Sequence, residues 1–360
     1  MAHEIGTFRT FISVIGVFLL AGVSVAACSQ DDADPALSDG TVDTTTVNDD
    51  QDAPTTTIAE PSSDESTTES SSDESTTESP SDESTIHDHF GQFGNVSTWE
   101  DGGYLRVASD GLANHNMMVG IVSWQQQVPI PQDYAGDNSW SIPLDPVLAD
   151  EPLSTSDHFH KGAVAIAVNG IPMFNALNNR GEFAADVGEL DEWGGHSGRA
   201  DDYHYHLAPE HLEGVVGEGN PIAYALDGFP LFSQTTETLD EYLGRFVEDG
   251  AYQYHAVDYA PYFIAGFRGE VEINLASEAP EDEVSPQAHT TPLRGAYGPL
   301  AGAAITGFTR TADNGYSLEY EIEGQTYYVN YSWDPDGVFV FEFIDASGDS
   351  TIETYRRNER

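Results

Sequence analysis

The hydrophobic pattern is most regular near the C-terminus, where apolar and polar residues alternate. Between Leu318 and Glu323 each apolar residue is followed by a glutamate, which is typical of a β-strand with one buried face. Two further alternating segments follow at residues 327–333 and 338–344, each preceded by a turn sequence that contains glycine. The pattern therefore predicts a small β-meander at residues 293–360.

The part of the chain between about residue 90 and the meander has short apolar runs bounded by Gly and Pro. Runs of this length between turn residues predict strands. The predicted strands are residues 104–108, 118–124, 163–168 and 222–226, and the predicted short helices are residues 209–216 and 237–244. We therefore expect one mainly β domain (β-rich α+β) at residues 87–275, joined to the meander by a linker at residues 276–292.

One strand–turn–strand pattern occurs twice in this domain. Residues 167–174 are Ala-Val-Asn-Gly-Ile-Pro-Met-Phe, and residues 225–232 are Ala-Leu-Asp-Gly-Phe-Pro-Leu-Phe. Each copy is followed by a Gly-Arg pair and then by a Tyr-x-Tyr-His sequence, at residues 198–199 and 203–206 in the first copy and at residues 244–245 and 252–255 in the second. We interpret this order as an internal duplication, with two similar units facing each other across a pseudo-twofold axis.

The N-terminal segment predicts export. Residues 11–27 are apolar and uncharged, and small residues at their end precede Cys28, the only cysteine. The run is short for a permanent membrane span, and polar residues follow it at once. Because this pattern resembles a bacterial lipobox, we expect residues 1–27 to be a lipoprotein signal peptide and Cys28 to be acylated. An ordinary signal peptide with an incidental cysteine is the alternative.

Residues 28–86 are expected to form a disordered stalk. Ser, Thr, Asp and Glu dominate this segment, and residues 29–85 contain no aromatic residue, Lys or Arg. Such a segment cannot bury apolar surface, and its like charges keep it extended. We therefore expect a folded domain outside the cytoplasm, held at the cell membrane by the lipid on Cys28.

The charge balance narrows the classes of partner. The chain has 12 Lys and Arg against 62 Asp and Glu, a formal net charge of −50. Such a surface repels nucleic acid and anionic lipid, so the lipid anchor is the expected contact with the membrane. The sequence has no Walker loop, dinucleotide glycine fingerprint or Gly-x-Ser-x-Gly motif. Neither nucleic acid nor a nucleotide is therefore an expected partner.

Histidines supply the candidate chemistry. In the Tyr-His-Tyr-His sequence, His204 and His206 would lie on one face of a strand, where two imidazoles can bind one metal ion. The tyrosines would then pack into the core from the opposite face. We predict a site for a transition metal (zinc, copper or iron) at His204 and His206, with His196 and His255 completing it.

Further candidates surround this predicted site. The duplication makes His255 the equivalent of His206, so it would converge on the same centre if the two units face each other. His158 and His160 are weaker candidates for ligands from the edge of the first unit. Three carboxylates are candidates for an additional ligand or for a partner that orients a histidine; they are Asp202, Glu189 and Asp191.

A structural role is the alternative for the clustered histidines, which would then hydrogen-bond to tyrosines and backbone in a polar core. His87 and His89, directly after the stalk, are expected to be exposed and incidental. The three glutamines at residues 125–127 would either bind a polar small molecule such as a glycan or anchor a loop through amide hydrogen bonds.

Several motifs together resemble the YHYH family, named for the tetrapeptide at residues 203–206. The resemblance spans about residues 100–270 and includes residues 110–111, 115–121, 124–129, 169–172, 178–182, 188–196, 221–230 and 261–263. It implies an exported bacterial domain, often a lipoprotein, without an assigned activity. The chain departs from the family at Gln253, where related proteins often repeat the histidine, and at Ser233, where glycine is common. If Gln253 replaces a ligand, the second half of any metal site is weaker than the first.

The leading hypothesis is a membrane-anchored, extracytoplasmic metal-binding protein, which includes a metal-dependent enzyme of unidentified substrate. A zinc ion would lower the pKa of bound water to about 7 and make it a nucleophile. The alternative is a non-catalytic surface-binding or scaffold module in which the Tyr-His sequences are structural. Measuring the metal content of the purified protein distinguishes the two.

Overall fold

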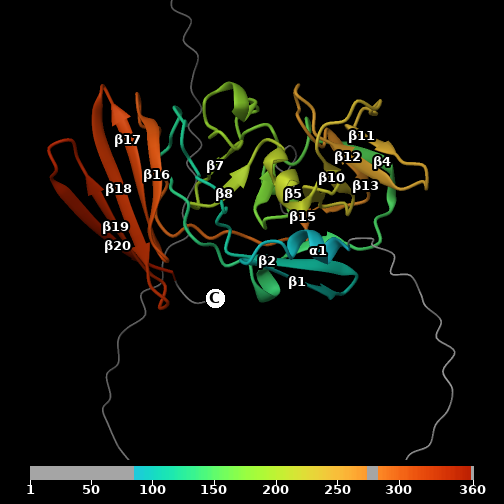
Figure 1. Ribbon diagram of the computed structural model, residues 1–360, viewed down its shortest axis with the longest axis horizontal. Coiled ribbons are helices and arrows are strands. Elements are labelled where there is room, and N and C mark those ends of the chain that lie inside the picture. The colour runs from blue at the N-terminus through green and yellow to red at the C-terminus, as the bar shows by residue number, and fades with distance from the viewer. Residues whose placement is uncertain (1–84, 274–282, 358–360) are drawn as a thin grey trace, which may run out of the picture. The chain divides into compact units, whose positions relative to one another are not determined.

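The structure is a computed structural model that describes residues 85–273 and 283–357 (Figure 1). The predicted signal peptide, Cys28 and nearly all of the predicted stalk lie outside the described residues. The protein is mainly β, as the sequence pattern predicted, and the strands of the described part form five sheets. Within the same residues, no helix is long and apolar enough to cross a membrane.

The largest sheet has eight strands in the order β11-β12-β10-β9-β5-β6-β8-β7. These strands are β5 (Ala163–Ala167), β6 (Pro172–Phe174), β7 (Gly195–Ser197), β8 (Tyr203–Tyr205), β9 (Ala223–Ala225), β10 (Pro230–Phe232), β11 (Gly244–Phe246) and β12 (Tyr252–His255). In the middle of the sheet, β5 and β9 are antiparallel neighbours. On one side β6 is antiparallel to β5 and parallel to β8, and on the other β10 is antiparallel to β9 and parallel to β12. The two four-stranded halves therefore share one topology, whereas their origin by duplication stays a prediction.

The strand register shows which residues of the two halves correspond. Tyr205 of β8 pairs with Gly195 of β7, and Tyr254 of β12 pairs with Gly244 of β11. Gly195 is therefore the counterpart of Gly244, and the Gly-Arg pair at residues 198–199 does not occupy this place. The repeated Gly-Arg sequence had indicated Gly198 as the counterpart of Gly244. That correspondence is wrong, because the first Gly-Arg pair lies in the turn between β7 and β8 and not in β7.

The two Asn-Gly and Asp-Gly turns connect the paired strands of each half. Gly170 and Gly228 have positive φ angles of 78° and 95°, which glycine adopts without strain. The side chains of Asn169 and Asp227 each accept a hydrogen bond from the backbone N–H two residues later, a typical turn contact of these residues. The repeated dipeptide therefore explains why each half reverses direction at this point.

Apolar burial is continuous through the middle of the sheet. Every residue of β5, Ala-Val-Ala-Ile-Ala, is buried, as expected for a strand covered on both faces. Farther out, the tyrosines of the two Tyr-x-Tyr sequences are buried and their rings pack edge to face, with centroids 5.6 Å apart in the first half and 5.2 Å apart in the second. These sequences therefore contribute to the core of both halves.

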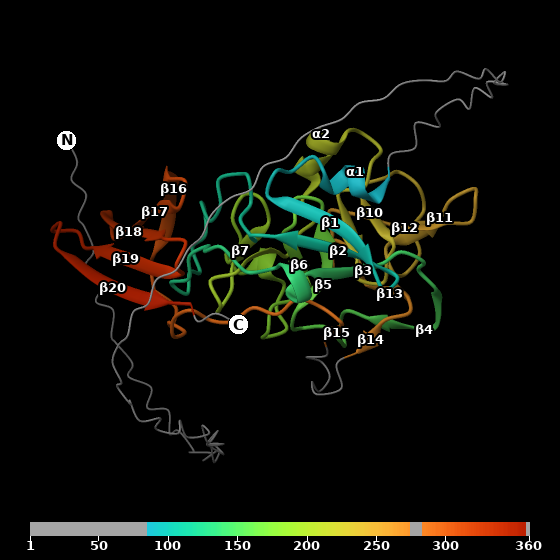
Figure 2. The ribbon, with the colours of Figure 1, turned by 90° about the horizontal axis from the view of Figure 1, so that it is seen from below.

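Smaller sheets and short helices complete the domain (Figure 2). An antiparallel sheet contains β1 (Val96–Asp101), β2 (Tyr104–Ser109) and β3 (Trp140–Pro143). Two strand pairs are β4 (Leu148–Ser154) with β13 (Gly266–Gly269) and β14 (Glu272–Ile273) with β15 (Val284–Ser285). The helices are α1 (Ile86–Phe90), η1 (Gly136–Asn138), η2 (Ala184–Asp186), η3 (Glu210–Leu212) and α2 (Glu213–Val216). The helices η3 and α2 confirm the predicted helix at residues 209–216. The strand β15 lies inside the segment that was expected to be a linker, residues 276–292.

Two predicted elements are wrong, the strand at residues 118–124 and the helix at residues 237–244. Met118 and Gly120 have positive φ angles of 71° and 97°, so the apolar run turns instead of extending. In the other segment, the carboxylate of Asp240 accepts two backbone N–H groups from residues farther along the chain. Such a side-chain contact replaces the hydrogen bonds of a helix.

The expectation that the first two histidines of the domain are exposed is wrong for His89. This residue lies in α1, is 6% exposed, and has its Nδ1 2.7 Å from the hydroxyl oxygen of Tyr224. The neighbouring Phe90 is fully buried. Because α1 packs against the core, these histidines belong to the folded domain.

The C-terminal strands form the predicted antiparallel meander. They follow one another in chain order as β16 (Ala304–Ala312), β17 (Gly315–Ile322), β18 (Gln325–Trp333), β19 (Val338–Ile344) and β20 (Ser350–Arg356). The meander contacts the rest of the domain, because the hydroxyl of Tyr331 donates to the Pro129 carbonyl at 2.6 Å. In the segment between β15 and β16, the buried guanidinium of Arg294 donates to the Asp201 carboxylate at 2.7 and 2.8 Å. The meander and the eight-stranded sheet belong to one compact unit.

Candidate metal centre

The strand pair β7 and β8 brings three histidines together. His204 of β8 is the register partner of His196 in β7, and His206 follows on the same face as His204 because side chains alternate along a strand. Tyr203 and Tyr205 lie on the opposite face and are fully buried. The Tyr-His-Tyr-His alternation therefore separates the imidazoles from the core, as the sequence predicted.

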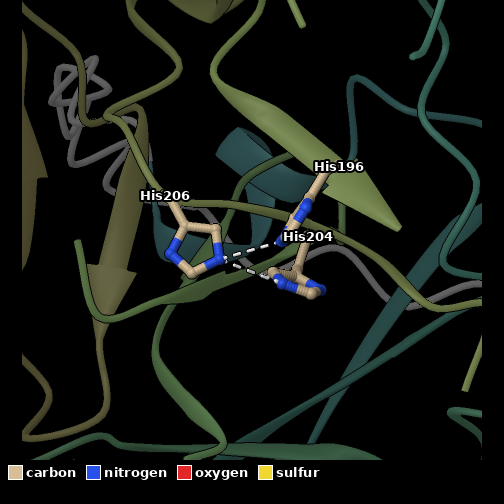
Figure 3. A group of neighbouring side chains, drawn as sticks. All are labelled: His196, His204 and His206. Carbon is tan, nitrogen blue, oxygen red and sulfur yellow. Dashed lines mark hydrogen bonds between the residues drawn. The ribbon is translucent and has the colours of Figure 1, made fainter. Parts of the chain in front are cut away.

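His206 is the central member of this cluster (Figure 3). Its Nε2 lies 3.1 Å from Nε2 of His196 and 3.2 Å from Nε2 of His204. The potential ligand atoms of the three residues all lie within 4.8 Å of one another. His204 and His206 are buried, and His196 is partly buried. The cluster thus offers one imidazole nitrogen from each residue to a shared centre.

Backbone carbonyls fix the ring orientation of two of the histidines. Nδ1 of His206 donates to the carbonyl of Asn175 at 2.5 Å, and Nδ1 of His204 donates to the carbonyl of Asp202 at 3.0 Å. Nδ1 of His204 also lies 3.5 Å from the Asp202 carboxylate. Because a carbonyl oxygen accepts only, both Nδ1 atoms carry the proton. In metal sites, a hydrogen bond from the ring nitrogen that does not bind the metal orients the histidine in this way.

These tautomers leave the Nε2 atoms of His204 and His206 without a proton. In the neutral rings, two lone pairs then face each other at 3.2 Å, and neither atom can donate a hydrogen bond. Buried acceptors placed in this way repel unless a cation or a donor lies between them. A proton on Nε2 of His196 can satisfy His206 in the neutral cluster, whereas a cation between the rings would be bound by all three Nε2 atoms.

Burial keeps the imidazoles of His196 and His206 in the neutral form that binds metals. It lowers the pKa of His206 to about 3, with the neighbouring His204 acting in the same direction. Burial also lowers the pKa of His196 well below its ordinary value, with His204 and His206 as further causes. Metal ions compete with protons for imidazole nitrogen, so His196 and His206 are available as ligands at neutral pH.

Phe174, at the end of β6, positions the rings from a third strand. Its ring stacks on His204 with centroids 3.9 Å apart and meets the edge of His206 at 6.3 Å. The next residue, Asn175, supplies the carbonyl that binds His206. The strand that holds the repeated Pro-containing motif therefore supports the cluster as well as the sheet.

Asp191 fixes the loop that carries His196. One carboxylate oxygen accepts the backbone N–H of Gly195 at 3.0 Å, and the other accepts the hydroxyl of Tyr203 at 2.7 Å. The Tyr203 ring lies so close to Gly195 that a Cβ there would collide with it. Asp240 makes the corresponding contacts with glycine and tyrosine in the second half. Because both halves have this brace, it is part of the scaffold and not of the metal chemistry.

A cavity of about 580 Å³ adjoins the three histidines. It falls in the size range of small-molecule sites. Aromatic and cationic side chains contribute to its wall, among them Trp124, Trp140, Phe174, Lys161, Arg180 and Arg199. A metal ion held by the three imidazoles would therefore face a space large enough for a small substrate.

The structure does not bring His255 to this cluster. In the sheet order, β12 and β8 are five strand spacings apart, which corresponds to roughly 24 Å at about 4.8 Å per strand. His255 instead donates from Nδ1 to the Ser233 carbonyl at 2.9 Å, and its Nε2 accepts the Gln253 amide at 2.8 Å. In the second half, the Gln253 amide therefore donates to Nε2 of His255. The equivalent atom of the first half, Nε2 of His206, instead faces the imidazole of His204.

The remaining predicted candidates have other places. His160 lines the cavity but does not belong to the three-histidine group, and His158 lies against the ring of Phe159. Of the carboxylates, Asp202 contacts His204 as expected. Glu189 instead binds the guanidinium of Arg180 at 2.6 Å.

Sequence reasoning missed the supports that come from β6. Phe174 stacks on His204, and the backbone of Asn175 binds His206. A backbone carbonyl leaves no signal in the identity of its residue. The recurrence of Phe at the end of each repeated motif was the one available signal, since Phe232 also packs against a histidine of its half, His255.

The comparison with known proteins agrees with the motifs. Residues 139–241 match the model of a family described as YHYH protein. This segment begins just before β3, includes all three clustered histidines, and ends before β11. No curated protein and no solved structure matches the chain. The protein therefore contains a YHYH domain, as its sequence motifs predicted.

Proposed function

We propose that this protein binds one divalent transition-metal ion through Nε2 of His196, His204 and His206. The observation that supports this best is the pair of Nε2 lone pairs of His204 and His206, which face each other at 3.2 Å while both Nδ1 atoms donate to carbonyls. A cation bound by both Nε2 atoms would replace this repulsion with two coordination bonds.

Zinc is the first candidate, ahead of copper and iron. A tetrahedral zinc with imidazole nitrogens at about 2.0–2.1 Å requires roughly 3.3–3.4 Å between neighbouring nitrogens. The separations of 3.1 and 3.2 Å around His206 need only a small adjustment to meet this value. Zinc also imposes no planar arrangement on its ligands, which suits three imidazoles that approach from two adjacent strands.

The supporting contacts match the demands of a metal site. Asp202 and Asn175 hold two of the rings through Nδ1, so that the protein presents Nε2 lone pairs before an ion arrives. Phe174 limits the rotation of His204 by stacking on it. The ion would therefore bind a preformed set of ligands, at a small cost in side-chain entropy.

Three protein ligands leave a coordination position for a water molecule or a substrate, which is typical of catalytic zinc sites. Zinc in such a site acts as a Lewis acid and lowers the pKa of bound water to about 7. Hydrolysis in the adjoining cavity is therefore the reaction class that we propose for this centre.

The proposed location follows from the sequence. Acylation of Cys28 would anchor the protein in the membrane, and the acidic segment up to residue 86 would separate the domain from the lipid surface. The charge of −50 opposes direct contact with anionic lipid. We therefore place the metal centre outside the cytoplasm, where it meets external solutes.

Metal analysis of the untagged protein tests the proposal. We expect about one equivalent of zinc after purification without chelators, and loss of that metal in the double variant His204→Gln, His206→Gln. The variant His255→Gln is the matched control, because it removes a buried histidine from the corresponding strand of the second half. It should keep its metal.

Unfolding curves of both variants show whether metal loss follows from the removed ligands or from a lost fold. The proposal fails if the folded wild-type protein holds less than about a tenth of an equivalent after incubation with zinc, copper or iron salts. It also fails if the folded double variant binds as much metal as the wild type.

A further inference from the structure

Resting on the proposed metal site, we propose that the adjoining cavity binds a small organic oxyanion, a carboxylate or a phosphate. Its acid group would contact Arg199, and Lys161 and His160 also line the cavity. The inference names the class of substrate and rests on three independent features of the cavity: its charge, its unpaired polar atoms and its aromatic surface.

The charge of the cavity wall differs from that of the whole chain. Acidic residues outnumber Lys and Arg by 62 to 12 in the sequence. The residues that line the cavity include three of each kind; they are Lys161, Arg180 and Arg199 against Glu189, Asp202 and Glu283. Lys161 is the only lysine of the protein. With a divalent ion on the histidines, this wall becomes net positive on a strongly negative molecule, a field that attracts anions.

Arg199 is the cation that remains available. Arg180 is engaged by Glu182 and Glu189, both at 2.6 Å, and Lys161 lies 3.4 Å from Glu283. Arg199 is exposed and, among the described residues, has no ion-pair partner. It lies in the turn between β7 and β8, five residues before His204. A guanidinium has a planar fork of donors that matches carboxylate and phosphate oxygens.

Unpaired buried polar atoms give a second line of support. His160 Nε2 and Trp140 Nε1 are both buried without a hydrogen-bond partner in the described structure, and both residues line the cavity. Buried polar atoms of native proteins are almost always paired with protein, water or ligand. An indole N–H can only donate, and an imidazole can donate to an anion. Two residues of the lining therefore hold a buried nitrogen without a protein partner, which an added acceptor would satisfy.

The remaining wall suits an organic body rather than a free inorganic ion. Trp124, Tyr134, Trp140 and Phe174 all contribute to the lining. Aromatic side chains of this kind provide the apolar surface of small-molecule sites, while a few polar groups set the orientation. The volume of about 580 Å³ exceeds what a lone phosphate would fill.

Calorimetric titration of the metal-loaded full-length protein tests this inference with three probes of similar shape. Benzoate and phenyl phosphate carry the two acid groups, and benzyl alcohol is their neutral analogue. We expect at least one acid to bind about ten-fold or more tightly than the alcohol, and the stronger of the two identifies the acid group. Equal affinity for all three probes would overturn the proposal.

Substitution of Arg199 distinguishes a direct contact between the acid and this arginine from nonspecific electrostatic attraction. Arg199→Gln should weaken binding of the preferred acid about ten-fold, as expected for the loss of a charge-assisted contact. Arg310→Gln, an exposed arginine outside the cavity, is the matched control and should have no effect. If both variants bind like the wild type, the acid does not contact Arg199 and the inference is wrong.

Metal content measured on the same samples keeps the two proposals apart. Arg199→Gln should retain its ion, because the arginine is not a ligand. In metal-free protein, binding of the acid should weaken but remain sensitive to Arg199→Gln. Binding that requires the ion and ignores Arg199 would show that the acid is only a ligand of the metal. That result contradicts this inference but leaves the proposed metal site intact.

Discussion

His115, His211 and Trp193 form a partly buried aromatic group that packs against the tyrosines of β8. The rings of His115 and Trp193 stack at 4.9 Å, and His211 meets both at 5.1 and 4.7 Å. His115 also contacts the hydroxyl of Tyr205 at 2.7 Å. Burial lowers the pKa of His115 to about 3 and that of His211 to about 4. The group is therefore neutral in the folded protein at physiological pH.

These pKa values predict acid lability. An unfolded histidine has a pKa of about 6.5, so the depressed values of His115 and His211 stabilise the fold fully above pH 6.5 and less as the pH falls towards 4. For His115 the loss is at most about 1.4 kcal/mol per pH unit. Urea unfolding of metal-free protein should show a constant free energy of unfolding from pH 7 to 8 and a steady decline below 6.5.

The variant His211→Phe keeps an aromatic ring beside Trp193 but cannot be protonated. It should therefore show a shallower decline below pH 6.5 than the wild type, while His196 and His206 continue to contribute to the remainder. Identical slopes in the two proteins would show that His211 is not held neutral by the fold.

At the residue scale, the sequence predicted the clustering of His196, His204 and His206 better than the contacts that support these rings. The spacing of His204 and His206 indicates one strand face, and the glycines around His196 indicate a turn that brings it back. Phe174 and the carbonyl of Asn175 lie in another strand. Their contacts depend on the parallel pairing of β6 with β8, which no local pattern specifies.

The element scale shows why His255 was assigned to the wrong place. The repeated motifs identified two similar units, and the two halves do have the same strand order. The halves join through β5 and β9 in the middle of one sheet, so equivalent residues lie far apart towards opposite edges. A facing arrangement and a side-by-side arrangement produce the same sequence pattern, because both bury the same strands.

The equivalence of the halves predicts that a second metal site can be built. Arg245 pairs with Gln253 across β11 and β12 as His196 pairs with His204. His255 donates to the Ser233 carbonyl as His206 donates to Asn175. The double variant Arg245→His, Gln253→His should therefore raise the metal content from about one to about two equivalents.

The single variant Arg245→Leu, which adds no ligand, is the control and should stay at about one equivalent. Metal analysis with an unfolding curve for each protein decides the outcome. A folded double variant that still binds only one equivalent would show that the second half lacks the geometry of the first.

At the scale of the whole molecule, the main electrostatic effect is repulsion between carboxylates. The net charge of −50 leaves most carboxylates without a cationic partner. Screening shortens the reach of this repulsion, since the Debye length is about 8 Å at 0.15 M salt and about 3 Å at 1 M. The melting temperature should therefore rise by at least about 3 °C between 0.05 and 1 M sodium chloride, roughly 1 kcal/mol in a protein of this size.

Sucrose at matched osmolality is the control for effects of the solvent that do not involve charge. It should raise the melting temperature less than the salt does. A melting temperature that is equal in low and high salt would show that the acidic residues are spaced widely enough to avoid mutual destabilisation.

The Gln253–His255 hydrogen bond has a consequence for the order of folding and the proposed metal binding. In the second half, the neutral amide of Gln253 donates to Nε2 of His255. In the first half, a cation would take the place of this donor beside Nε2 of His206. The same strands pair there without three histidines, so assembly of the sheet does not wait for metal. If the proposed metal site is right, we expect the protein to fold before it binds an ion, and its stability then to rise with the concentration of free metal.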